Sequence, residues 1–212
     1  MTIRAVIFDL DGVLTDTAEQ HFQAWKQLAE EEGLPFDREA NEDLRGLSRR
    51  DSLLRILGSR EVDEARLAAL MERKNGYYRQ RLAGLTPQDT LPGAREAIEA
   101  ARRRGWRVAI GSSSRNARTV LDRLGLTDQF DAIADGNTTE RAKPAPDLFL
   151  AAAEALGVAP EETLVVEDAA SGVDAALRAG MRVVGVGPVD RVGHAHQRVP
   201  STADLDFAEI CA

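Results

Sequence analysis

Two aspartates separated by one residue follow the first apolar stretch of the chain. Asp9 and Asp11 come directly after residues 5–8, and Gly12 follows them. An aspartate carboxylate can attack phosphorus to form an aspartyl phosphate, and a second, protonated carboxyl group can give a proton to the departing oxygen. Because aspartate and glycine are also common in turns, this motif alone is compatible with a solvated turn as well.

Further polar groups follow other apolar stretches. Ser112 ends one stretch, Glu167 and Asp168 end another, and Lys143 comes just before two prolines, Pro144 and Pro146, ahead of a helical pattern. A serine hydroxyl with nearby backbone N–H groups could hold a phosphoryl oxygen, and an ammonium could neutralise it. Acidic strand ends that meet in one crevice repel each other unless a hard cation lies between them. Mg²⁺ suits such oxygen ligands and a substrate phosphate.

These groups need a sheet to position them. Stretches rich in valine and isoleucine alternate with helical patterns, which predicts a parallel sheet covered by helices on both faces. The predicted strands are residues 3–8, 106–110, 131–134, 163–166 and 182–186, and the predicted helices are 93–104, 147–156 and 169–179. Ligands of such sheets bind beyond the carboxyl ends of the strands, so we expect the polar groups in one crevice. The last stretch, 191–212, indicates only a polar loop and a short terminal helix.

The stretch after the first strand has helical signals and no strand, so it is predicted to be an inserted domain. Its predicted helices are 17–32, 38–45, 50–57 and 63–82. We therefore predict an α/β fold: a Rossmann-like three-layer core with a central parallel sheet, plus an inserted helical cap of the four-helix-bundle type. The core domain would comprise residues 1–15 and 88–212, and the cap residues 16–87. Hinges are expected where the chain crosses between them, near 13–16 and 84–89.

Composition limits the possible partners. With 35 acidic and 27 basic residues the net charge is -8, which gives no broad cationic field for nucleic acid or anionic lipid. No apolar stretch is long enough for a membrane span or a signal peptide. Cys211 is the single cysteine and cannot form an internal disulfide, so a cytoplasmic location is expected. We also expect a monomer, because no long apolar patch lies outside the predicted core.

Four motifs, in this order along the full length, together resemble the signature of the haloacid dehalogenase-like phosphotransferase superfamily: DLDGV at 9–13, Ser112 after a strand, Lys143 in KPAPD, and Glu167-Asp168 after VV. The resemblance implies that Asp9 is the nucleophile and Asp11 the general acid and base. It implies that Ser112 and Lys143 hold the transferred phosphoryl group.

The same resemblance implies one Mg²⁺ per chain. Its ligands would be the side chains of Asp9, Asp168 and often Glu167, with the main-chain oxygen at Asp11. The resemblance also implies that the first and fourth strands lie side by side, which would bring Asp9 and Asp168 together.

Within the predicted cap, LRGLSRRDSL at 44–53 resembles the cap loop of β-phosphoglucomutases. These enzymes interconvert β-D-glucose 1-phosphate and D-glucose 6-phosphate through bound glucose 1,6-bisphosphate, which is both activator and intermediate. Carried over by position, the resemblance implies that a small-molecule sugar phosphate is bound by His21, Trp25, Arg45, Gly46, Leu47, Arg49, Ser52, Lys74, Ser114, Arg115 and Asn116. Thr17 would lie at the hinge and link cap closure to the pose of Asp11.

Within that set, Arg49 and residues 114–116 would hold the distal phosphate. The sugar would be contacted or oriented by His21, Trp25, Gly46, Ser52 and Lys74. Arg45 and Arg115 stand where many family members have lysine. A planar guanidinium group in place of an ammonium group changes the geometry of the hydrogen bonds to the ligand, so the choice among glucose-like sugars stays open.

Some of these positions can be checked against spacing and composition. Thr17, His21 and Trp25 lie four residues apart and share one helix face, which is compatible with lining a cleft and equally with packing. Only three of the 27 basic residues are lysines. A lysine kept against that bias is expected to be needed as a compact ammonium, which favours roles for Lys74 and Lys143.

Three alternatives remain. A sugar-phosphate phosphatase of the same superfamily would share the core residues and differ in how well its cap excludes water. A phosphoacceptor signalling domain also takes phosphate on aspartate, but it needs no helical lid. A dinucleotide-binding protein is disfavoured because the glycine motif at 185–188 lacks its third glycine. The cluster of Arg45, Arg49 and Arg50 is also compatible with a solvated basic helix face.

Overall fold

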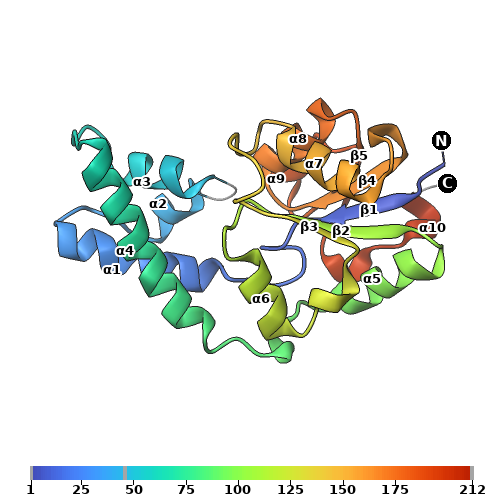
Figure 1. Ribbon diagram of the computed structural model, residues 1–212, viewed down its shortest axis with the longest axis horizontal. Coiled ribbons are helices and arrows are strands. Elements are labelled where there is room, and N and C mark those ends of the chain that lie inside the picture. The colour runs from blue at the N-terminus through green and yellow to red at the C-terminus, as the bar shows by residue number, and fades with distance from the viewer. Residues whose placement is uncertain (1, 45–46, 211–212) are drawn as a thin grey trace.

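The computed structural model describes residues 2–44 and 47–210. Within these ranges six parallel strands form one sheet, in the order β3-β2-β1-β4-β5-β6 (Figure 1). The strands are β1 (Ala5–Phe8), β2 (Arg107–Gly111), β3 (Ala132–Ala134), β4 (Thr163–Glu167), β5 (Arg182–Val186) and β6 (Gln197–Val199). The expected neighbourhood of the first and fourth predicted strands is confirmed, because β1 pairs with β4.

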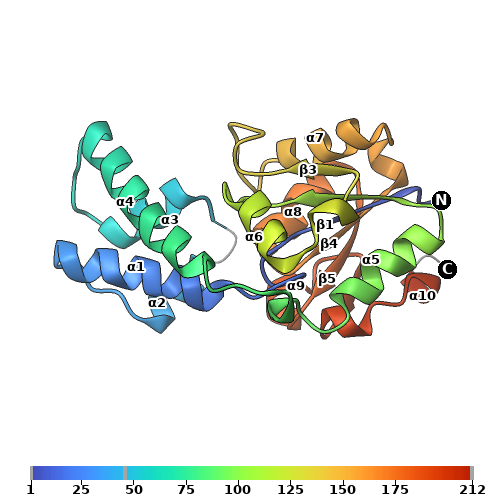
Figure 2. The ribbon, with the colours of Figure 1, turned by 60° about the horizontal axis from the view of Figure 1, so that its bottom comes forward.

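Both faces of the sheet are covered by helices. One face packs against α5 (Ala94–Arg103), α6 (Ala117–Leu124) and α10 (Phe207–Ile210), and the other against α7 (Asp147–Leu156) and α8 (Ala170–Arg178). Figures 1 and 2 show α5 and α7 on opposite sides of the strands. The short α9 (Val189–Val192) lies against α8, and 3-10 turns span Pro87–Asp89, Thr127–Gln129, Pro160–Glu162 and Thr202–Asp204. The three-layer core is confirmed.

Strand β1 shows why its sequence is apolar throughout. Successive side chains of a strand point to opposite faces, so Val6 and Phe8 enter the layer with α5 and α6. Ala5 and Ile7 enter the layer with α7 and α8. All four are completely buried. The apolar run therefore ends where the strand leaves the core, at Asp9.

The inserted segment forms four helices beside the sheet: α1 (Ala18–Glu32), α2 (Arg38–Glu42), α3 (Arg49–Leu57) and α4 (Glu64–Leu82), counted in the part of the chain that the structure describes. Side-chain oxygens of Asp37, Ser48 and Asp63 accept the N-terminal N–H groups of α2, α3 and α4. The helices have their own apolar cluster, which includes Leu28 and Leu53. Ala24, Tyr78 and Leu82 of the same helices pack instead in the cluster on the sheet, so the inserted segment is also joined to the core by apolar contacts.

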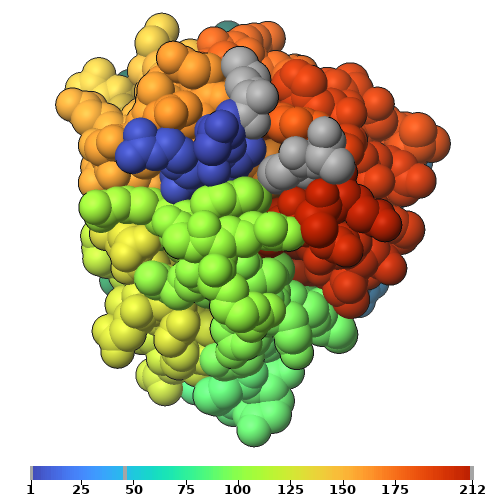
Figure 3. Space-filling view, turned by 90° about the vertical axis from the view of Figure 1, so that its right-hand side faces the viewer, coloured from blue at the N-terminus to red at the C-terminus, as the bar shows by residue number. Residues whose placement is uncertain are grey.

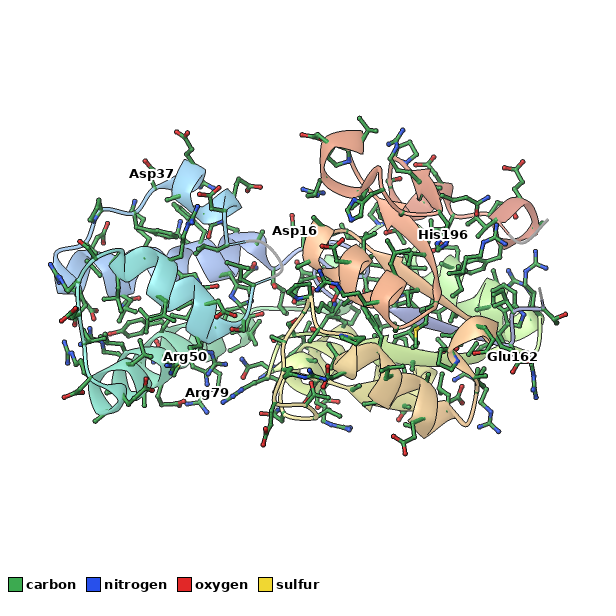
Figure 4. All side chains as sticks on the ribbon, turned by 90° about the horizontal axis from the view of Figure 1, so that it is seen from above. Asp16, Asp37, Arg50, Arg79, Glu162 and His196 are labelled. Carbon is green, nitrogen blue, oxygen red and sulfur yellow. The ribbon has the colours of Figure 1, made fainter. Side chains whose placement is uncertain are left out.

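The two chain segments that join cap and core lie side by side. The Thr15 hydroxyl donates to the carbonyl oxygen of Asp89 at 2.8 Å, and the Leu91 N–H donates to the carbonyl oxygen of Leu14 at 2.8 Å. Figure 4 places Asp16 between the helical part and the sheet part. Figure 3 shows the end of the molecule that lies away from the inserted helices. There the N-terminal segment (blue) lies between the segment around α5 (green) and the segment that precedes β4 (orange).

Two elements differ from the sequence-based expectation. The helix α6 was not predicted, although Val120, Leu121 and Leu124 are buried on one face and Gly125 ends it. The stretch 191–212 is not only a loop with a terminal helix, because it contains β6. This edge strand has three residues, QRV, too few and too polar to give a period-2 pattern. Among the described residues, no helix is both long and apolar enough to cross a bilayer.

Candidate active site

A cleft of about 660 Å³ lies between the carboxyl ends of the strands and the cap. In this strand order the chain connections leave β1 and β4 in opposite directions, and the crevice at that point is where ligands usually bind. The cleft brings together nearly all the predicted positions: Asp9, Asp11, Ser112, Lys143, Glu167 and Asp168 with His21, Trp25, Leu47, Arg49, Ser52, Lys74, Ser114, Arg115 and Asn116. Thr17 lies buried behind Asp11, and Arg45 and Gly46 lie outside the described residues.

The core end of the cleft is built on a buried ion pair. The N–H of Asp9 donates to the carbonyl oxygen of Val166 at 2.9 Å, which fixes Asp9 beside β4. Lys143 Nζ donates to Asp9 Oδ1 at 2.5 Å and to Glu167 Oε1 at 2.7 Å. Burial alone would lower the pKa of Lys143, but the two carboxylates outweigh it and raise that pKa, so the ammonium stays charged.

Glu167 holds Lys143 in place. Its second oxygen, Oε2, accepts the N–H of Ala169 at 2.6 Å. A Cβ at Gly172 would lie 1.7 Å from Oε1, so the glycine makes room for this carboxylate. Both oxygens of Glu167 therefore have a protein partner, and its role as a metal ligand stays a prediction.

The acidic residues at the carboxyl ends of β1 and β4 fit a magnesium ion. Asp168 lies beside Gly12, where a Cβ would be 2.4 Å from Asp168 Oδ2. Burial raises the pKa of Asp9 well above its usual value, and the nearby carboxyl groups of Glu167, Asp168 and Asp11 add to this against the opposing effect of Lys143. A cation in this space would offset that cost.

Among the described residues, no three acidic, histidine or cysteine side chains form a metal cluster on their own. Mg²⁺ does not require one, because it is usually held by one or two carboxylates together with waters and substrate phosphates. Asp9 and Asp168, with the main-chain oxygen of Asp11, make such a set.

Asp11 is placed to exchange a proton. Burial raises its pKa, and the hydrogen bond from the Thr17 hydroxyl and the charge of Lys143 act in the opposite direction. Thr17 Oγ1 donates to Asp11 Oδ1, and Tyr78 OH donates to Thr17 Oγ1 at 3.1 Å. A raised pKa favours the protonated form of Asp11, which is the form that a general acid needs.

The loop after β2 forms a polar floor beside these acids. The N–H of Ser112 donates to the carbonyl oxygen of Ala134 at 3.1 Å and so continues the pairing of β2 with β3. Ser112 Oγ accepts the N–H of Ser114 at 3.1 Å, and Ser114 Oγ accepts the N–H of Asn116 at 3.2 Å. These turns direct the buried Ser112 hydroxyl into the cleft, where it can bind a phosphoryl oxygen.

The cap end of the cleft gathers cations and aromatic rings. Lys74 Nζ donates to His21 Nδ1 at 2.7 Å and lies 4.5 Å from the ring centroid of Trp25. Burial, followed by the charge of Arg49, lowers the pKa of Lys74 well below its usual value. Burial and the charges of Lys74 and Arg49 lower the pKa of His21, so its ring is neutral and Nδ1 accepts. Trp25 both lines the cleft and packs in the cap cluster.

The neighbouring arginines of the cap have different environments. Arg49 lines the cleft, and burial together with the charge of Arg115 lowers its pKa. Arg50 also borders the cleft, but its half-exposed side chain forms an ion pair with Glu64 at 2.7 Å, as expected for a solvated basic helix face. Arg49 and Arg115 therefore face one region of the cleft with like charges, which an anion there would relieve.

Among the residues that the sequence analysis missed are Tyr78, which lines the cleft, and Asn75, which joins the cap to the core. Tyr78 lies four residues after Lys74 on α4, and this spacing was the available signal for it. Asn75 Oδ1 accepts from Asn116 Nδ2 at 2.9 Å, a direct hydrogen bond between cap and core. No sequence pattern indicates that pair, because it depends on how the two parts meet.

Comparison with known proteins agrees with this geometry. The sequence model of the haloacid dehalogenase-like hydrolase family matches residues 3–180. The β-phosphoglucomutase of Bacillus subtilis is 45% identical over 96% of this chain and 92% of its own length. The phosphorylated carbohydrates phosphatase of Thermotoga maritima is 34% identical over 87% of this chain and 85% of its own.

A solved structure is also very similar. The crystal structure of β-phosphoglucomutase from Clostridium difficile matches with a TM-score of 0.95 and 39% identity, over 99% of this chain and 96% of that one. The chain therefore belongs to the haloacid dehalogenase-like hydrolase family.

Proposed function

We propose that the chain is a magnesium-dependent β-phosphoglucomutase, which interconverts β-D-glucose 1-phosphate and D-glucose 6-phosphate through glucose 1,6-bisphosphate. The observation that carries the proposal is the pair of anion-binding ends in one cleft: Ser112 and Lys143 beside Asp9, and Arg49 with Arg115 on the cap side. A substrate with one phosphate needs the first end, and a bisphosphate needs both. The relatives from Bacillus subtilis and Clostridium difficile carry the same name.

The chemistry takes two phosphoryl transfers on Asp9. In the first, the 6-hydroxyl of glucose 1-phosphate attacks the phosphorus on phosphorylated Asp9, its proton passes to Asp11, and the bond from phosphorus to Asp9 breaks. After the bisphosphate turns end over end, Asp9 attacks the phosphorus at position 1. The bond to the sugar oxygen breaks, and Asp11 returns the proton to that oxygen, which leaves glucose 6-phosphate.

The other side chains bind and orient. Ser112 and Lys143 would hold the reacting phosphoryl group, and Arg49 and Arg115 the other one. A magnesium ion held by Asp9, Asp168 and the main-chain oxygen of Asp11 would neutralise charge on the transferring group. Lys74, His21, Trp25 and Ser52 would contact the sugar, and Leu47 would pack beside it.

The cap is expected to exclude water from phosphorylated Asp9. We take residues 16–87 as the cap and residues 1–15 and 88–212 as the core, with hinges at the paired crossings. The Asn75–Asn116 hydrogen bond supports a cap that rests on the core beside the site. Water kept out of the cleft cannot hydrolyse the aspartyl phosphate.

A phosphatase acting on sugar phosphates is the second candidate, because the Thermotoga maritima relative has that name and the core residues would serve both reactions. The deciding assay supplies β- and α-glucose 1-phosphate separately, with Mg²⁺ and trace bisphosphate. Glucose 6-phosphate from the β anomer supports the mutase, and inorganic phosphate as the main product supports the phosphatase. Self-phosphorylation without sugar turnover would support a signalling domain.

A matched pair of variants tests the distal end. Arg49→Ala is expected to raise KM for the sugar phosphate about tenfold, the equivalent of one charge-assisted hydrogen bond. Arg55→Ala removes an exposed arginine of the same helix, which pairs with Asp43 and is not among the residues that line the cleft, and is expected to leave KM unchanged. Equal effects of the two would contradict a distal phosphate site at Arg49. Location in the cytoplasm, the monomeric state and the absence of nucleic-acid and membrane partners stay predictions from the sequence.

A further inference from the structure

A chain of hydrogen bonds runs from the cap to the proton-exchanging carboxyl group, and its cap end is Tyr78. Tyr78 OH donates to Thr17 Oγ1 at 3.1 Å, and Thr17 Oγ1 donates to Asp11 Oδ1. Tyr78 belongs to α4, Thr17 precedes α1, and Asp11 lies in the loop after β1. Tyr78 and Thr17 are completely buried, so water does not compete for the hydrogen bond between them.

Donation runs in one direction along this series of hydrogen bonds, from Tyr78 to Thr17 to Asp11. Thr17 has one hydroxyl proton, and a hydroxyl oxygen that accepts from Tyr78 must use that proton elsewhere. An ionised carboxylate accepts and cannot donate, so the Thr17 proton points to Asp11 Oδ1. Burial and the charge of Asp11 raise the pKa of Tyr78 well above its usual value, so Tyr78 stays a donor. The proton that Asp11 exchanges with a substrate is then left to the other oxygen, Oδ2.

The ring of Tyr78 is held by the residues that face the sugar. It stacks on His21 with 4.0 Å between ring centroids and an interplanar angle of 25°. Lys74 Nζ lies 4.9 Å from its centroid, one helical turn away on α4. Because Thr17 is the N-cap residue of α1, which packs along α4, a shift of these helices relative to the loop after β1 would separate Thr17 from Asp11.

We propose that Tyr78 is a positioning residue for proton transfer, which acts through Thr17 to fix the oxygen of Asp11 that carries the exchangeable proton. It does so only while α1 and α4 lie against the core loop. This inference rests on the proposed function in one respect, the role of Asp11 as the group that gives and takes the proton. It assigns no contact between Tyr78 and the substrate.

The test uses two adjacent tyrosines. Tyr78→Phe removes only the hydroxyl that starts the chain. Tyr77→Phe is the matched control, because Tyr77 OH donates to Glu31 Oε2 at 2.7 Å on the other side of the cap. Tyr78→Phe is expected to lower kcat about fivefold, the rate equivalent of one ordinary hydrogen bond, with KM within about twofold of the wild type. Tyr77→Phe is expected to change neither.

A double-mutant cycle separates this role from a structural one. In a Thr17→Val background the series of hydrogen bonds is already interrupted, so adding Tyr78→Phe is expected to have no further effect on kcat. Thr17→Ser keeps the hydroxyl and is expected to keep the sensitivity to Tyr78→Phe. A loss that vanishes beside Thr17→Val and persists beside Thr17→Ser cannot come from misfolding, which thermal unfolding of each variant checks directly.

Additive losses from Thr17→Val and Tyr78→Phe, or an unchanged kcat in Tyr78→Phe, would overturn the inference. Either result is distinct from failure of the mutase proposal. If the wild type released phosphate in place of glucose 6-phosphate, the same cycle would be measured on phosphate release, since that reaction also needs a proton from Asp11.

Discussion

The two ends of the cleft each bury a lysine, and the two lysines have opposite environments. Lys143 at the core end donates to Asp9 and Glu167, and these carboxylates raise its pKa despite burial. Lys74 at the cap end faces neutral His21 and the charge of Arg49, and its pKa is lowered. Their exposed fractions are 3% and 2%, so burial lowers both pKa values alike, and the neighbouring charges decide that the net shifts have opposite directions.

This contrast separates two tasks. The core end holds acidic groups close together and needs fixed cations, which suits a site where a phosphoryl group is transferred. The cap end holds Lys74 and Arg49 beside aromatic rings, which suits a site that a phosphorylated sugar completes. The same type of substitution at the two ends, such as lysine to methionine, is therefore expected to have different effects on stability and activity.

The largest effect is expected at Asp9. Asp9→Asn keeps the shape of the side chain and removes the nucleophile, so turnover is expected to fall at least about a thousandfold. The phosphorylated enzyme should also be missing when intact protein is weighed by mass spectrometry after incubation with glucose 1,6-bisphosphate. Thermal unfolding is the control for the fold. Retained activity would show that Asp9 is not the nucleophile. The core end could then no longer be assigned to phosphoryl transfer as opposed to sugar binding.

Replacing each buried lysine by methionine compares the ends directly. Lys143→Met leaves the buried carboxylates of Asp9 and Glu167 without their ammonium, so the free energy of unfolding is expected to fall by about 3 kcal/mol. Lys74→Met removes a buried charge that Arg49 repels, so that free energy is expected to stay the same or rise. Urea unfolding at one pH measures both. Equal losses in the two variants would show that burial, not partner charge, governs these lysines.

Much of the core end could be predicted from the sequence. Asp9, Ser112 and Asp168 follow strands directly, and parallel strands bring their carboxyl ends to one edge. The scarcity of lysine also singled out Lys74 and Lys143, both of which line the cleft, whereas Lys26 is half-exposed beside Glu30. These signals are local, so one sequence carries them.

The cap end of the cleft was harder to predict from the sequence, because its contacts join segments that are far apart along the chain. Tyr78 and Thr17 are 61 residues apart, and Asn75 and Asn116 are 41 apart. Spacing placed His21 and Trp25 on one helix face but could not decide between packing and lining the cleft. The structure shows Trp25 doing both, since the face that meets the cap core also borders the cleft. Only the tertiary arrangement contains that information.

A smaller effect is expected from His21, whose pKa is lowered. A group with a depressed pKa in the folded state contributes stability above its unfolded pKa, about 6.5, and this contribution is lost as the pH falls. The wild type is expected to lose up to about 1.4 kcal/mol of unfolding free energy per pH unit below 6.5 from this group. His21→Asn keeps an acceptor for Lys74 and cannot be protonated there. Its urea unfolding between pH 7.5 and 5.5 should show a shallower decline. Parallel declines would place the pH sensitivity elsewhere.

The smallest effect is expected at the rim of the core end, where Arg191 of α9 lies 3.8 Å from Asp168 Oδ2. A cation beside a carboxylate opposes the binding of Mg²⁺ to it, but the Arg191 side chain is partly exposed and its contact with Asp168 is long, at 3.8 Å, so the opposition is weak. Arg191→Ala is expected to lower the Mg²⁺ concentration that half-saturates thermal stabilisation by about two- to fivefold. Arg198→Ala is the control, because Arg198 donates to the carbonyl oxygen of Gly187 and not to Asp168. A weaker response to Mg²⁺ in Arg191→Ala would mean that this arginine supports the acidic end, so that the core end relies on more cations than Lys143.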